Sequence, residues 1–175
     1  MKKLSILSGL LLACGISPQA SAENIHARLI GYQEVPSVST VARGEFVGQI
    51  SPDDQFIDYE LTFSGLQGDV RQAHIHVGQK SVSGGVVIWL CQTSFNQGPA
   101  GTQTCPQSGT IRGTIRASDV VAITGVNASQ QIAAGELAEV LAAIRAGVAY
   151  ANVHTNLSTG GEIRGQIRAS RRDKD

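Results

Sequence analysis

A short pattern that recurs three times limits the folds that this chain can adopt. Each copy reads Gly-x-apolar-x-Gly-x-Ile-x, and the copies occupy residues 44–51, 109–116 and 161–168. Side chains alternate between the two faces of a strand, so the apolar residue, the second glycine and the isoleucine share one face. The opposite face is mainly polar or charged, with Arg164 and Arg168 in the third copy, which is typical of half-buried antiparallel strands. The second glycine predicts a bend, a bulge or a side chain lying close over the backbone.

Similar alternating segments fill most of the remaining chain. Strands are predicted over residues 25–30, 56–63, 73–78, 86–90 and 148–155, with turn-forming segments between them. One α-helix is predicted over residues 136–146, because its apolar residues recur at i, i+3, i+4 and i+7. The unequal spacing of the three copies argues against a solenoid. We therefore expect an all-β fold, a Greek-key antiparallel β-sandwich or barrel of about eight strands with one short helix.

The first 22 residues have the pattern of a secretory signal peptide. Lys2 and Lys3 precede a short apolar stretch over residues 4–12, and a small-residue cleavage site ends at Ala22. We expect a signal peptide over residues 1–22, one domain over 23–170 and a charged tail over 171–175. An alternative reading makes Cys14 the lipidated residue of an anchored lipoprotein. Both readings place the protein outside the cytoplasm, either in the periplasm or secreted.

The charge and hydropathy of the chain exclude two classes of function. Lys and Arg number 14, as do Asp and Glu. Loss of Lys2 and Lys3 with the leader makes the mature chain slightly acidic, which is not the balance of a nucleic-acid-binding protein. The apolar stretch of the leader is too short for a membrane-spanning helix, and no later segment is long and apolar enough. We therefore expect neither a nucleic-acid partner nor a transmembrane segment.

Two cysteines remain after the leader, Cys91 and Cys105. An even pair in an exported protein predicts a disulfide. The bond would close a loop rich in Gln, Asn, Gly and Thr, and closing a loop of this size stabilises by about 3 kcal/mol in the chain-entropy model. The competing interpretation, a pair of thiolate metal ligands, is disfavoured by an oxidising compartment.

The segment Ala73–Gly78 carries two histidines with strand parity. His74 and His76 point to one face, and Ala73, Ile75 and Val77 take the core-facing side. His154 has the same parity in the strand predicted over 148–155, where Ala151 and Val153 face the core. If the two strands are neighbours, three imidazoles meet on one polar face.

Three neutral imidazoles are a ligand set for copper(II) or zinc. The mature chain has no methionine, so a soft sulfur site is not expected. The Irving–Williams order favours copper over zinc at a nitrogen site when both metals are present. Water, His26 or Glu162 could supply a fourth ligand. The competing interpretation is that the imidazoles only form hydrogen bonds at a strand edge.

Four motifs in this order resemble the CHRD domain, a module named after its repeats in chordin and common in exported bacterial proteins. They are Gln33–Pro36, Ala73–Gly78, Tyr150–Thr155 and Gly160–Ile167, and the resemblance covers roughly residues 27–169. Most members of the family have no assigned function. The growth-factor binding of chordin does not transfer to a single-domain bacterial protein.

The chain also has a distant similarity to the copper/zinc superoxide dismutases, which are Greek-key β-barrels. By this similarity His74, His76 and His154 fall where that family holds copper, and Arg164 falls near its anion-guiding arginine. The sequence between residues 77 and 153 contains no histidine, so a bridging imidazole and a zinc site are not expected.

These patterns leave three hypotheses for the function. The first is an exported, non-catalytic copper or zinc carrier or buffer that uses the three histidines. The second is a metal-free interaction module that binds an envelope protein. The third is a copper-only, dismutase-like oxidoreductase with Arg164 as the nearby cation.

Overall fold

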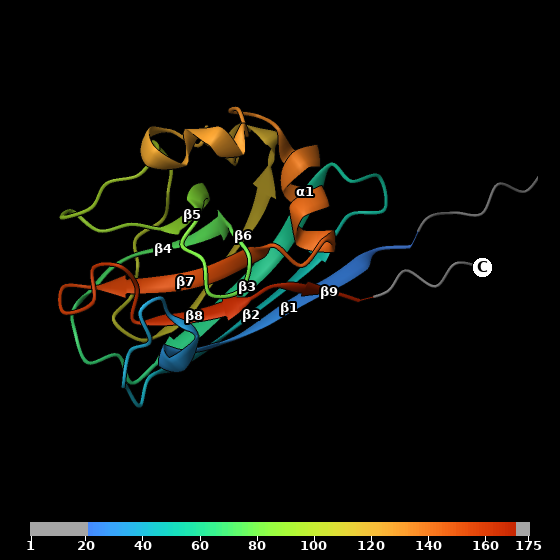
Figure 1. The fold of residues 1–175 in the computed structure, drawn as a ribbon. Coiled ribbons are helices and arrows are strands. Elements are labelled where there is room, and N and C mark those ends of the chain that lie inside the picture. Colours follow the sequence, from blue (N-terminus) through green and yellow to red (C-terminus); the bar gives the residue numbers. More distant parts are fainter. Residues whose placement is uncertain (1–20, 171–175) are drawn as a thin grey trace, which may run out of the picture.

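The structure is a computed structural model that describes residues 21–170 (Figure 1). The predicted signal peptide lies outside this range except for its last two residues, and so does Cys14 within it. The predicted charged tail over 171–175 also lies outside the range. Eight main strands and a short ninth are accompanied by one α-helix and three 3₁₀ turns. In chain order they are β1 Glu23–Ile30, η1 Gly31–Gln33, β2 Arg43–Ile50, β3 Phe56–Ser64, β4 Val70–Val77, β5 Gly85–Cys91, β6 Gly109–Arg116, η2 Ala117–Asp119, η3 Gly125–Gln130, α1 Leu137–Arg145, β7 Ala149–Thr155, β8 Ile163–Gln166 and β9 Arg168–Ala169.

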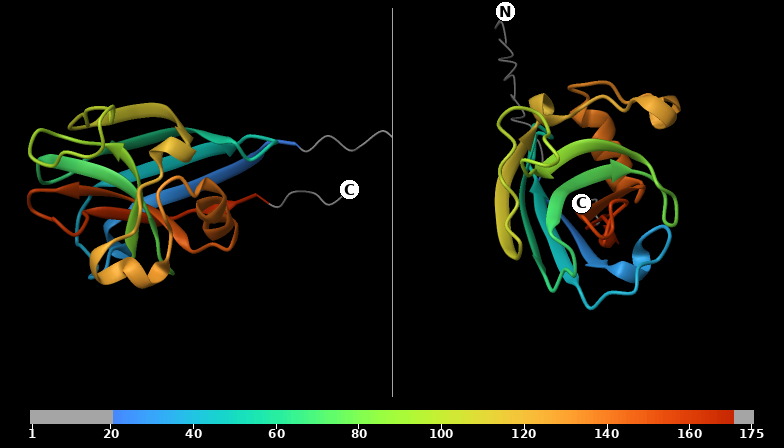
Figure 2. Two further views of the ribbon diagram at one scale, coloured as in Figure 1. Left: turned by 90° about the horizontal axis from the view of Figure 1, so that it is seen from above. Right: turned by 90° about the vertical axis from the view of Figure 1, so that its left-hand side faces the viewer.

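The strands form one sheet that curls into a nearly closed barrel (Figure 2). Its order is β5-β4-β7-β8-β1-β2-β3-β6, with β9 beside β1, and every pairing is antiparallel. The late strands β7 and β8 therefore lie between β4 and β1. The end strands β5 and β6 face each other across the remaining seam. The predicted all-β barrel or sandwich with one short helix is confirmed.

The core is built from the alternating apolar residues of each strand. Strand β1 alternates buried and exposed positions along almost its whole length, and the inward residues of the strands, with the apolar stripe of α1, form one cluster of buried side chains. The central glycines do allow close approach. The ring of Tyr59 lies over Gly113, and the backbone of Arg28 lies against Gly165, where a Cβ would meet the Arg28 carbonyl oxygen. The third copy of the pattern is not one strand but two, because β8 ends at Gln166 and Ile167 bonds to Ala149 instead.

The disulfide predicted between Cys91 and Cys105 is confirmed. It joins the end of β5 to the long connection that leads into β6. Within this connection the Cα of Gly98 packs against the indole of Trp89. The loop thus holds in place a side chain that faces the histidine cluster described below. In the part of the chain that the structure describes, no helix is long and apolar enough to cross a membrane.

Candidate metal centre

The pairing of β4 with β7 brings the three predicted histidines together. His74 is the register partner of Asn152, and His154 is the partner of Gln72, so all three imidazoles leave the same face of two adjacent strands. One ligand atom from each of His74, His76 and His154 lies within 4.8 Å of the others. Their neighbours Ala73, Ile75 and Val153 are fully buried in the core on the other face. The predicted parity and convergence are therefore present.

The three imidazoles are buried even though they lie on the outer face of the sheet. Their exposed fractions are 2% for His74, 7% for His76 and 6% for His154. Trp89 packs edge-on against His74 with ring centroids 4.2 Å apart, and Tyr150 stacks flat on His76 at 4.7 Å. The loop over residues 78–84 crosses in front of β7 and completes the cover (Figure 1).

Backbone carbonyls fix the orientation of two of the rings. Nδ1 of His76 lies 2.9 Å from the carbonyl oxygen of Gly84, and Nδ1 of His154 lies 2.9 Å from that of Thr159. A carbonyl can only accept, so both Nδ1 atoms carry the proton and both Nε2 atoms carry a lone pair. This arrangement is how proteins orient histidines that bind metals.

Burial keeps the cluster neutral. It holds the pKa of His74 well below its ordinary value, with further lowering by His154 and His76. It lowers the pKa of His76 to about 4, against a smaller opposing effect of the bond to Gly84, and it lowers that of His154. Neutral imidazole is the form that coordinates a metal ion.

Acceptor atoms crowd together inside the cluster. Nδ1 of His74 lies 3.2 Å from Nε2 of His154, and Oδ1 of Asn152 lies 3.0 Å from the same Nε2. Nε2 of His74, Nε2 of His76 and Oε1 of Gln72, which shares this face of β4, are buried and have no hydrogen-bond partner in the described chain. Buried polar atoms without a protein partner are rare, so these three need an explanation, and a bound ion or an ordered water would supply one.

The two residues considered as a fourth ligand lie elsewhere. His26 is exposed on β1, away from the cluster. Glu162 is buried, but its carboxylate accepts hydrogen bonds from Thr40, Thr155 and the backbone of Gln67 and Gly68. Burial raises the pKa of Glu162, but these donors outweigh it and leave the pKa below its ordinary value. These bonds join the segments around Thr40, Gln67 and Thr155, so the carboxylate of Glu162 ties three parts of the chain together.

Arg164 is also buried, at 2% exposed. Its Nη1 and Nη2 donate to the carbonyls of Val82 and Gln79 at 3.0 Å each, and its guanidinium lies 3.4 Å from the centre of the Tyr150 ring. Arg164, Tyr150 and His76 thus form a stack that joins the loop over 78–84 to the cluster. The polar strand face predicted for Arg164 is covered by this loop, and a role in guiding anions stays a prediction.

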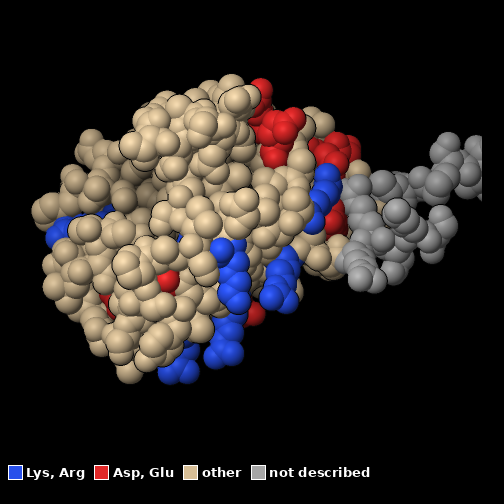
Figure 3. All heavy atoms as spheres, in the orientation of Figure 1, with Lys and Arg blue, Asp and Glu red and all other residues tan. Residues whose placement is uncertain are grey.

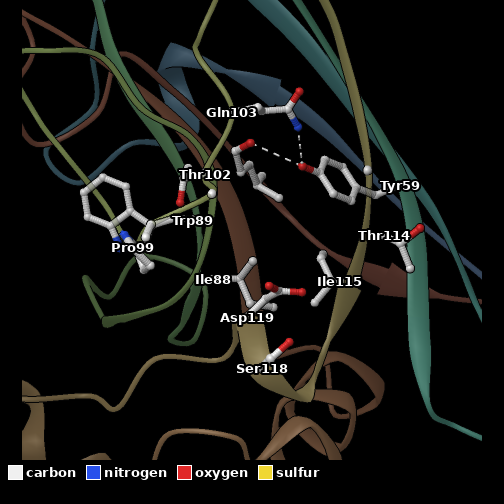
Figure 4. Close-up of a pocket in the computed structure, with 14 residues that line it drawn as sticks. Tyr59, Ile88, Trp89, Pro99, Thr102, Gln103, Thr114, Ile115, Ser118 and Asp119 are labelled. Atoms are coloured by element: carbon white, nitrogen blue, oxygen red, sulfur yellow. Dashed lines mark hydrogen bonds between the residues drawn. The ribbon is translucent and has the colours of Figure 1, made fainter.

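A hollow of about 270 Å³ lies at the seam between β5 and β6, on the other side of Trp89 (Figure 4). Its Tyr59 hydroxyl and its Asp119 carboxylate already have partners in the chain. The Tyr59 hydroxyl donates to the carbonyl of Leu90 and accepts from Nε2 of Gln103, and Asp119 accepts from the backbone of Arg116. The structure therefore gives no sign of a ligand there.

Sequence reasoning gave no role to the residues that cover the cluster. Tyr150 and Asn152 share the parity of His154, so the sequence places them on its face without indicating what they contact. The position of Trp89 depends on the pairing of β5 with β4, which is interrupted by register shifts around His74. No local pattern could have revealed the carbonyls of Gly84 and Thr159.

Comparison with known proteins adds one result. No curated protein and no solved structure matches the chain. The family model of the CHRD domain matches residues 25–167, which is most of the chain and nearly all of the described barrel. The chain therefore belongs to the CHRD domain family.

Proposed function

We propose that this CHRD protein is an exported carrier or buffer that binds one copper ion, or zinc in its place, through His74, His76 and His154. The observation that supports the proposal is the convergence of three buried, neutral imidazoles, two of which have Nε2 lone pairs fixed by backbone carbonyls.

The tautomers of the rings determine which nitrogen of each histidine can bind the metal ion. Nε2 of His154 cannot both bind a metal ion and accept a proton from His74. A three-histidine site therefore requires His74 to bind through Nδ1 and to hold its proton on Nε2. The 3.2 Å between these two nitrogens matches the roughly 3.3 Å expected between two nitrogens at 2.0–2.1 Å from a tetrahedral ion.

Asn152 provides a second argument for a cation. Its Oδ1 and Nε2 of His154 both carry lone pairs, and at 3.0 Å two acceptors repel each other. In the metal-free protein this contact is favourable only if the amide is turned so that its NH₂ group faces the ring. A bound cation would instead favour the oxygen, which makes Asn152 a candidate for the fourth position.

The choice of metal follows from the ligand set. Imidazole nitrogen with an amide oxygen is borderline in softness and suits copper(II) and zinc. The Irving–Williams order gives copper the higher affinity at such a site.

Burial favours a carrier over an oxidoreductase. A dismutase needs a coordination position open to solvent, but Trp89, Tyr150 and the loop over 78–84 cover the three rings. A metal-free interaction module would leave the buried lone pair on Nε2 of His76 without a role. The leader pattern and the disulfide support an export route to an oxidising compartment.

Copper titration of the purified, metal-free mature protein tests the proposal. We expect one equivalent of copper(II) to give an electron paramagnetic resonance spectrum with hyperfine structure from several nitrogens. The double variant His74→Ala/His154→Ala should lose this signal. His26→Ala is the matched control, because it removes an exposed histidine outside the cluster and near the new amino terminus.

The result that would overturn the proposal is a double variant that folds and still gives the wild-type titration. Copper binding that His26→Ala abolishes would assign the metal to the amino terminus and would contradict the proposal as well.

A further inference from the structure

A second cavity lies behind the Arg164–Tyr150 stack, between η1 and the loop over residues 78–84. Its volume is about 330 Å³, at the lower end of the range of small-molecule sites. The residues that line it include Glu34, Arg164, Gln166, Lys80 and Ser81. Unlike the hollow at the seam, this cavity is lined by charged side chains that have hydrogen-bonding groups without a partner in the described chain.

Glu34 is the first of these groups. It is 6% exposed, and its Oε1 has no hydrogen-bond partner in the described chain. The carboxyl lies against the backbone of Gly161 and, among residues 21–170, accepts a hydrogen bond from the backbone N–H of Val35 alone. Burial raises its pKa to about 7 although Arg164 acts in the opposite direction, which means that the neighbouring groups compensate its charge poorly.

Arg164 is the second group. A guanidinium has five N–H donors, and only two of those of Arg164 have acceptors within residues 21–170, the carbonyls of Gln79 and Val82. Glu34 and Arg164 bear opposite charges in one cavity, yet no nitrogen of Arg164 comes within 4.0 Å of a carboxylate oxygen of Glu34. Both residues are held apart by their other contacts, so neither can satisfy the other.

A ligand that completes both groups must present a cationic donor to Glu34 and an anionic acceptor to Arg164. An α-ammonium group supplies three donors, and an α-carboxylate can take two parallel bonds from a guanidinium. Lys80 at the rim adds a second cation beside the carboxylate. Lys and Arg also run across the lower centre of this face of the molecule, while acidic side chains gather at its upper right (Figure 3).

We propose that the cavity between Glu34 and Arg164 binds a free α-amino acid, with its ammonium group on Glu34 and its carboxylate on Arg164. This site is separate from the histidine cluster and does not depend on the proposed metal. Arg164 would serve both regions, since its other face lies on Tyr150.

Calorimetric titration of the metal-free protein with each of the twenty standard L-amino acids tests the proposal. Metal is first removed with a chelator, and the chelator is then dialysed away, so that neither bound copper nor chelator contributes to the measured heat. We expect at least one amino acid to bind. Its N-acetyl derivative and its carboxamide should each bind at least about tenfold more weakly, because each lacks one of the two charges.

The variant Glu34→Gln keeps the shape of the side chain and should weaken the best amino acid at least about tenfold. Glu45→Gln, an exposed position on β2, is the matched control and should leave binding unchanged. The proposal would be overturned if none of the twenty amino acids bound at ligand concentrations up to about 10 mM, the upper limit of the titration. A derivative that binds as tightly as its parent would also overturn it. The derivative series uses the wild-type protein, so the test stands even if Glu34→Gln does not fold.

Discussion

His76 and Tyr150 stack face to face, with ring centroids 4.7 Å apart and planes inclined by only 4°. The two residues are register partners on adjacent strands, so the pairing of β4 with β7 itself creates the stack. Nδ1 of His76 is bound to the carbonyl of Gly84, and the Tyr150 hydroxyl accepts from the N–H of the same residue. The ring of His76 is thus fixed by one flat contact and one hydrogen bond.

Replacing Tyr150 should therefore weaken metal binding in proportion to what is lost. Tyr150→Leu removes the stack on His76 and the platform for Arg164, and we expect copper affinity to fall about 10- to 100-fold, as for other outer-shell partners. Tyr150→Phe keeps the stack and loses only the bond to Gly84, so its effect should be smaller. Competition with a chromogenic chelator measures both. Equal affinities for Tyr150→Leu and the wild type would show that the stack does not support the site.

Trp89 gives a direct optical readout of the cluster. It is the single tryptophan of the chain, and its ring lies 4.2 Å from that of His74. We expect copper(II) to quench its fluorescence with an end point at one equivalent. Zinc, a closed-shell d¹⁰ ion, should occupy the site with little quenching, and an excess of zinc should raise the copper concentration needed for quenching. Fluorescence that does not change on addition of copper would place the metal away from His74.

Glu34 should make stability depend on pH in a defined direction. Its pKa is about 7 in the folded protein against an ordinary 4.5, so its contribution is fully present below pH 4.5 and is lost as the pH rises through 7. At about 1.4 kcal/mol per pKa unit, the loss is about 3 kcal/mol. Glu34→Gln should remove this decline and should therefore be more stable than the wild type at pH 8. Urea unfolding of both proteins at pH 5 and pH 8 measures the difference. Parallel pH profiles of the two proteins would contradict the raised pKa.

The buried histidines change the pH dependence of stability in the opposite direction. They lower the free energy of unfolding as the pH falls. Their pKa values are lowered, so their contribution is present above about pH 6.5 and is lost as the pH falls. Comparing Glu34→Gln with the wild type cancels this contribution, because the histidines are the same in both proteins.

The sequence predicted the parts of the site that depend on strand parity. The alternation in Ala73–Gly78 and Tyr150–Thr155 correctly gave the face from which each imidazole leaves. Parity cannot say which strands are neighbours, and the pairing of β4 with β7 joins residues about 80 positions apart. The sequence argument for this pairing was the distant similarity to the copper/zinc superoxide dismutases, by which the three histidines fall at one copper site.

What the sequence could not predict is the cover over the polar face. A charged residue in an alternating strand normally faces water, and Arg164 was placed accordingly. It is buried because the loop over residues 78–84 crosses it and offers the carbonyls of Gln79 and Val82 as partners. The path of a loop depends on contacts made after the sheet has formed, and these leave no periodic pattern in the sequence.

Gly84 connects this loop to the histidine cluster, because its carbonyl oxygen holds Nδ1 of His76. A Cβ at this position would lie 2.6 Å from the carbonyl carbon of Val77, where no real side chain fits. Gly84→Ala should therefore displace the carbonyl that holds Nδ1 of His76. We expect the fold to survive with a stability loss of about 1–3 kcal/mol, as for overpacking elsewhere. Copper affinity should fall about tenfold or more, because the proton on His76 loses its acceptor.

Val126→Ala is the control for this variant, because the Val126 side chain is 98% exposed on η3, outside both the loop and the histidine cluster. Its copper affinity and its stability should equal those of the wild type. Thermal melts and chelator competition on the two alanine variants separate a local effect on His76 from general damage. A Gly84→Ala protein with reduced stability but unchanged copper affinity would mean that the carbonyl of Gly84 does not orient His76 for the metal, and that the ring is held by Tyr150 alone.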